Sequence, residues 1–159
     1  MNHVIKNLVG MIFVAGFFLV FLYMVEAQYL LPRSIVPVPG VTLDQWLSSF
    51  KLWGVIGILT ALAASLLWYI LAQWVFRVNN LSDAGPRRVW EALILIPILS
   101  VVAALFFTRS AQAGEMLAYA LYIVNALLCY YFSTVLFSPS SHKFVPYFAS
   151  FLRPLLRGA

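Results

Sequence analysis

The sequence predicts an all-α polytopic membrane protein, a four-transmembrane-helix bundle with an amphipathic outer loop segment and a cytoplasmic interfacial tail. Hydrophobic residues make up 64% of the chain and charged residues only 9%, whereas a soluble domain carries about 25% charged residues. The apolar residues are gathered into four long blocks, and a helix needs about 20 such residues to cross a bilayer. Because the hydrocarbon core holds no water to bond a bare backbone, each block is expected to be helical.

We expect one membrane domain over residues 1–159, because the spans use most of the chain. The spans are predicted at about residues 6–30, 52–76, 89–108 and 116–137, and the interfacial tail at 138–159. The first span includes an uncharged run longer than the 7–15 residues of a signal-peptide core. A membrane helix is therefore favoured there, with a cleaved signal peptide as the alternative.

Glu26 and Asn125 are the two candidate polar residues within the membrane. An acid in a membrane helix is by default a functional hypothesis, such as a site for a cation or a proton. The simpler interpretation of Glu26 is an interfacial carboxylate that reaches headgroups or water. Asn125 lies near the middle of the fourth span, where an unpaired amide is costly. We expect it to bond another helix, with a ligand or ion path as the alternative.

The connection 31–50 begins with a proline-rich, irregular part and ends in an amphipathic turn or two. Thr42 followed by Gln45 resembles a capping box that starts a helix. The apolar residues after this box recur at helical spacing, so we expect the segment to lie in the membrane interface. Trp46 and Phe50 thereby become candidates for contact with lipid or a partner protein.

The second and third spans form a predicted hairpin around the short basic loop 77–88. Trp90 follows this loop, and we expect its indole to mark the membrane surface, where tryptophan is enriched. Pro97 lies within the third span and predicts a kinked helix.

The second span carries a stripe of small residues. Gly57, Ala61 and Ser65 recur every four residues, a spacing that lets another helix backbone approach closely. We favour packing inside the bundle, with a homo-oligomer contact as the alternative.

The fourth span follows a connection so short that spans three and four must be antiparallel neighbours. Tyr122, Asn125, Cys129 and Ser133 fall along one of its faces. Cys129 is the only cysteine, so it cannot form an intramolecular disulfide. We interpret it as a small apolar filler of the core.

The tail combines aromatic and basic residues. We expect Pro146 to open a short helix that ends before Pro154 and rests on anionic lipid or on a partner's membrane-proximal surface. The candidate residues for a partner or lipid interface are Trp46, Phe50, Arg87, Arg88, Tyr147, Phe148, Phe151, Arg153 and Arg157.

Positive charge is distributed unevenly between the two sides of the predicted bundle. The side with the termini and the hairpin loop carries Lys6, Arg77, Arg87, Arg88, Lys143, Arg153 and Arg157, and the other side carries Arg33, Lys51 and Arg109. The positive-inside rule therefore predicts cytoplasmic termini. Compact loops make a bacterial inner membrane the default location. The charge lies next to the spans, which favours lipid headgroups over nucleic acid as its partner.

The sequence holds no motif that predicts catalysis. It has no Cys/His set for a metal, no P-loop, GxSxG, HExxH or Rossmann glycine pattern, and no histidine within a span to hold haem. We expect no enzyme, metal or cofactor. The favoured function is a non-catalytic subunit that assembles with one or more larger membrane proteins. The alternatives are a small transporter or channel component that uses Glu26 or Asn125, and a membrane immunity protein against a pore-forming toxin.

Overall fold

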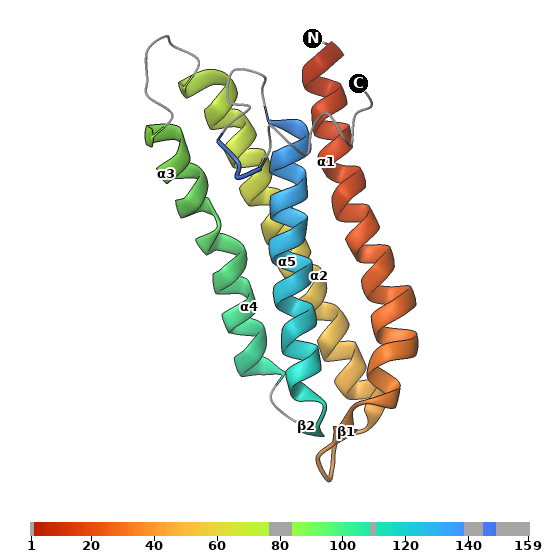
Figure 1. Ribbon diagram of the computed structural model, residues 1–159. Coiled ribbons are helices and arrows are strands. Elements are labelled where there is room, and N and C mark those ends of the chain that lie inside the picture. The colour runs from red at the N-terminus through yellow and green to blue at the C-terminus, as the bar shows by residue number, and fades with distance from the viewer. Residues whose placement is uncertain (1, 77–83, 109–110, 139–144, 149–159) are drawn as a thin grey trace.

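The computed structural model describes residues 2–76, 84–108, 111–138 and 145–148, which form an elongated helical bundle (Figure 1). The helices are α1 (Asn2–Phe21), the π-helix η1 (Leu22–Leu30), the 3₁₀-helix η2 (Leu31–Arg33), α2 (Leu43–Ile70), the π-helix η3 (Leu71–Val75), α3 (Ala84–Leu93), α4 (Leu95–Phe107) and α5 (Glu115–Phe137). The short strands are β1 (Val36–Pro37) and β2 (Ala111–Ala113).

Four helical segments of the described chain are long and apolar enough to cross a membrane. They are His3–Arg33, Leu43–Val75, Gly85–Phe107 and Glu115–Phe137. The predicted four-helix membrane bundle is therefore confirmed. The start of α1 and the end of α5 lie at the same end of the bundle (Figure 1), as an even number of spans requires.

The second span begins earlier than predicted. The capping box is present, because the Gln45 N–H donates to Thr42 Oγ1 and the Thr42 N–H donates to Gln45 Oε1. From Leu43 the helix runs on without a break, so its first two turns are part of the span. Trp46 and Phe50 are 2% and 0% exposed. Their predicted contact with lipid or a partner is wrong, because the apolar side of these turns faces the protein's own core.

The third span is kinked, as Pro97 predicts. Helix α3 ends at Leu93 and α4 begins at Leu95. The ring of a proline clashes with the carbonyl four residues before it and removes one backbone bond, which places the disruption at Leu93. At Ile94 the N–H bonds to the Glu91 carbonyl, three residues back.

At the end opposite the start of α1, two loops pair as a small antiparallel sheet of β1 and β2 (Figure 1). Gly114 follows β2 with φ of +80° and caps the start of α5. A Cβ at this position would lie 2.1 Å from the Ser34 carbonyl oxygen. Only glycine fits both the left-handed backbone and this close approach. The sequence does not predict this pairing, since strands of two or three residues carry no detectable alternation.

Helix α5 packs against α1, α2 and α4. The small residues of α2 face this core. Ala61 and Ser65 are fully buried, and a Cβ on Gly57 would lie 3.8 Å from Ala126 Cβ on α5 and from Ser100 Oγ on α4. The structure therefore supports the prediction that these three residues pack within the bundle.

Candidate functional site

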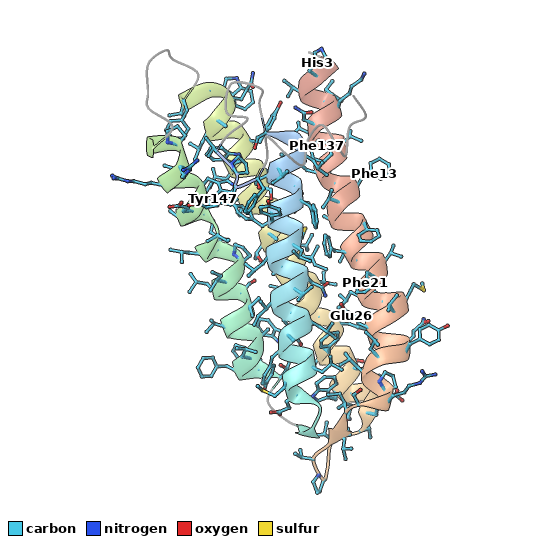
Figure 2. All side chains as sticks on the ribbon, in the orientation of Figure 1. His3, Phe13, Phe21, Glu26, Phe137 and Tyr147 are labelled. Carbon is cyan, nitrogen blue, oxygen red and sulfur yellow. The ribbon has the colours of Figure 1, made fainter. Side chains whose placement is uncertain are left out.

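Glu26 and Asn125 meet inside the bundle. The two side chains are 0% and 2% exposed, and Asn125 Nδ2 donates to both carboxyl oxygens of Glu26 at 2.9 Å. Figure 2 shows Glu26 on the side of the first span that faces α5. Glu26 is therefore not an interfacial carboxylate in contact with headgroups or water. Asn125 forms the interhelical bond that the sequence predicted.

The π-helix η1 sets the direction of Glu26 and of the residues after it. The buried residues of the first span are Met11, Ala15, Phe18, Leu22, Glu26, Ala27 and Leu31. Spacing along this stripe is three or four residues up to Glu26. Ala27 is buried directly after Glu26, and Leu31 follows four residues after Ala27 and five after Glu26. The Leu31 N–H donates to the Glu26 carbonyl, which is the i to i+5 bond of a π-helix. The wider turn keeps both Glu26 and Leu31 in the core while Tyr29 stays outside.

Aromatic rings cover one side of the pair. Tyr122 lies one turn before Asn125 on α5, and its ring stacks on Phe50 with centroids 4.8 Å apart. Phe50 stacks in turn on Trp46 at 5.7 Å. Tyr122 Oη donates to the Phe50 carbonyl at 3.4 Å. Tyr122, which carries this stack, lies between Asn125 and the start of α5, where β2 ends.

No basic side chain of the described residues pairs with Glu26. Lys51 lies on the neighbouring helix α2, but its Nζ sits over the ring of Tyr23, 5.8 Å from the centroid. The Asn125 Oδ1 atom is also buried, and it has no hydrogen-bond partner among the residues that the structure describes. The site therefore pairs one carboxyl group with one amide, and the amide oxygen of Asn125 is the acceptor that this pairing leaves without a hydrogen bond.

A second polar cluster joins α3 to the later half of α5. Trp90 Nε1 donates to Thr134 Oγ1 at 3.0 Å, and Tyr130 Oη donates to the Trp90 carbonyl at 2.7 Å. Trp90 is only 4% exposed, so it lies inside the bundle and does not mark the membrane surface as predicted. These bonds fix the start of the third span against α5.

Tyr147 connects the tail to this cluster. Its hydroxyl donates to Glu91 Oε1, and its backbone carbonyl accepts from Tyr131 Oη. The guanidinium of Arg87 lies 5.2 Å from the centre of its ring. Donation to Glu91 raises the pKa of the Tyr147 phenol. The sequence could not pair Glu91 with Tyr147, because 56 residues separate them and neither belongs to a local motif.

The other residues that were predicted to form an interface differ in their exposure and in whether the structure describes them. Arg88 is exposed, and Phe148 is 74% exposed with φ of +60°. Residues 145–148 form a bend and a turn, so the helix predicted to start at Pro146 is absent there. Phe151, Arg153 and Arg157 lie outside the described residues.

The outer surface of α1 carries an apolar groove of about 670 Å³, lined by Val9, Ile12, Phe13, Gly16, Phe17 and Val20. Two glycines on α1 differ in role. A Cβ on Gly10 would lie 2.2 Å from the Phe137 ring, so Gly10 serves the α1–α5 contact. A Cβ on Gly16 would meet no atom within 4 Å. Gly16 therefore leaves a notch in a surface that faces away from the bundle.

Comparisons with protein-family models, curated proteins and solved structures found no match to this chain. Among the described residues, no three His, Cys, Asp or Glu side chains come together as a potential metal site. The Glu26–Asn125 pair and the groove of α1 are the features of the described residues that bear on function.

Proposed function

We propose that this chain is a non-catalytic integral membrane subunit of a larger membrane protein complex. We place it in a bacterial inner membrane with both termini in the cytoplasm. The observation that supports this proposal best is the α1 groove with Gly16 at its floor. The occupant we propose is a transmembrane helix of a larger partner.

The chemistry of the groove favours such an occupant. All its lining residues are apolar, and it lies within a segment long enough to span the bilayer. Ile12 and Val20 lie one helical turn before and after Gly16, so the notch is flanked along the helix axis. A small residue with larger neighbours lets a second helix backbone approach closely. Within the described part of the chain, a Cβ on Gly16 would meet no atom within 4 Å, and the backbone there is helical. These two observations favour an external contact as the role of this glycine.

The distribution of charge supports the orientation. Lys6 lies in the first turns of α1 and Arg87 and Arg88 lie in the first turns of α3, whereas Arg33 lies in η2 and Lys51 lies in the first turns of α2. The starts of α1 and α3 lie at one end of the bundle, and the start of α2 lies at the other (Figure 1). Basic residues accumulate on the cytoplasmic side of membrane proteins. The proposed partner helix would therefore pack on α1 nearer to the cytoplasmic leaflet.

The test is gentle extraction of the native protein followed by native mass spectrometry. The wild-type chain should come with a stoichiometric larger membrane protein. Gly16→Leu fills the notch and should reduce that partner at least about fivefold, since an overpacked contact loses about 1–3 kcal/mol. Phe106→Ala is the control, because Phe106 on α4 is 79% exposed but outside the groove. A wild-type chain that runs alone, or a Gly16→Leu chain that keeps the partner, contradicts the proposal.

A small transporter or channel component is the second candidate function. The buried carboxyl of Glu26 within a π-helix is the observation that favours it, since π-turns are frequent at functional sites. This candidate requires water to reach Glu26 from both sides during transport. It predicts that Glu26→Gln abolishes flux in proteoliposomes while the chain stays folded. Equal flux in the wild type and in this variant would contradict it.

A further inference from the structure

We propose that Glu26 is a proton-binding site. Its carboxyl group stays protonated at neutral pH and donates a hydrogen bond to Asn125 Oδ1. The neutral acid and the amide then form a closed pair with two hydrogen bonds between the first span and α5. The ligand is a proton, and the site is the contact between Glu26 and Asn125. This inference does not depend on the presence of a partner protein.

The count of donors and acceptors supports the neutral acid. An ionised carboxylate can only accept, and an asparagine amide offers both a donor and an acceptor. With Glu26 ionised, Asn125 Nδ2 is bonded but Asn125 Oδ1 stays buried without a partner. A protonated Glu26 supplies the missing donor. Reorientation of the two groups in their common plane then gives one O–H···O and one N–H···O bond.

The surroundings offer no compensation for a negative charge. On α5, Tyr122 lies within electrostatic reach of Glu26, and Tyr119 donates to Glu115. On α2, Lys51 lies over Tyr23. The cations of the first span are Lys6 near the start of α1, far along the chain from Glu26, and Arg33 in η2, and α4 has no charged residue. A buried charge without a partner is expensive and is commonly neutralised instead.

Loss of the proton should therefore loosen the bundle at one defined place. The ionised carboxylate still accepts from one amide donor, but a charge in the membrane interior is unfavourable in free energy. Opening of the contact between η1 and α5 would let water reach that charge. The site would then link the protonation state to the packing of the first span.

The test is infrared difference spectroscopy of the full chain in lipid nanodiscs. The chain has five acids, Glu26, Asp44, Asp83, Glu91 and Glu115. We expect one protonated carboxyl band in the wild type at neutral pH. Glu26→Gln should remove this band, and the same substitution at Glu115, which bonds Tyr119 at the start of α5, should leave it. A wild-type spectrum without the band, or a band that survives Glu26→Gln, overturns the proposal.

Stability against pH gives a second readout. Where the native chain holds the proton and the unfolded chain has released it, the folded-to-unfolded ratio should fall about tenfold per pH unit as the pH rises. Glu26→Gln keeps an amide–amide pair and should remove this slope. A slope of the same size in both proteins overturns the proposal. The wild-type spectrum requires no variant, so the test stands even where Glu26→Gln folds poorly.

Discussion

Helix α5 carries a polar cluster on each half, and the two clusters are built differently. In the first half, Asn125 donates hydrogen bonds to Glu26, and both side chains are almost fully buried. Toward its end, Tyr130 and Thr134 bond Trp90, and the neighbouring tail brings Tyr147, which is 46% exposed. The first cluster concentrates its stabilisation in one buried contact. The second distributes it over several bonds, some of them near the surface.

This difference predicts how each cluster responds to the loss of one member. A buried polar group left unpaired costs about 1–3 kcal/mol, and more when it carries charge. A group that keeps other partners, or that can reach water, costs less. Substitutions in the Glu26–Asn125 pair should therefore be more damaging than substitutions in the Trp90 cluster.

The largest effect is expected from Asn125→Ala. It leaves Glu26 buried with no partner, and we expect the free energy of unfolding to fall by about 3 kcal/mol. Thr134→Ala in the other cluster should cost about 1 kcal/mol. Unfolding titrations with SDS in mixed micelles measure both values. A loss for Thr134→Ala as large as that for Asn125→Ala would remove the distinction between the clusters.

The same interface between α1 and α5 has an apolar contact at its other end, which Gly10→Ala would break. The added Cβ would meet the Phe137 ring at 2.2 Å, and overpacking of this kind costs about 1–3 kcal/mol. Gly16→Ala is the matched control, because its Cβ meets open space. Thermal unfolding in detergent should separate the two alanine variants. Equal midpoints would show that α1 is not packed on α5 through Gly10.

Tyr130→Phe changes a buried member of the second cluster. The change removes the hydroxyl that donates to the Trp90 carbonyl at 2.7 Å, and a typical bond of this kind contributes about 0.5–1.5 kcal/mol. We expect a loss within that range and a change in the near-ultraviolet circular dichroism of Trp90. An unchanged spectrum together with unchanged stability would argue against this contact.

The smallest effect is expected from Tyr147→Phe, since Tyr147 is half exposed. The bond to Glu91 needs a protonated phenol, and this bond raises the phenol pKa. Its stabilisation is therefore present at neutral pH and is lost as the pH rises through the raised pKa. We expect the tail to become more accessible to limited proteolysis in alkaline solution, and the Tyr147→Phe variant to show this accessibility at neutral pH as well. A tail that is cleaved equally at all pH values in both proteins would contradict the contact.

The sequence predicts the parts of this fold that depend on local pattern. The four spans follow from the long uncharged runs, the start of α2 from Thr42 and Gln45, and the kink from Pro97. The sequence does not predict whether an apolar helix face packs against lipid or against the protein core, because both surroundings are apolar. That is why the pattern places Trp46 and Phe50 in an interface, although they pack toward Tyr122 in the core.

The candidate site is predicted only in part, for a related reason. The sequence predicts that Asn125 bonds another helix, because an unpaired amide in the membrane is costly. It does not predict the partner, since 99 residues separate Asn125 from Glu26. The position of Glu26 near the end of a span indicates an interfacial side chain. The π-helix η1, which has no sequence signature, keeps the inward stripe continuous from Glu26 to Leu31.

The most direct measurement is a double-mutant cycle with Glu26→Leu, Asn125→Leu and the double variant. We predict that the two single losses in unfolding free energy together exceed the loss in the double variant, with a coupling of at least about 2 kcal/mol. Each single variant leaves one buried polar group without a partner, and the double variant leaves none. Additive losses, within about 0.5 kcal/mol, would contradict a direct contact between Glu26 and Asn125.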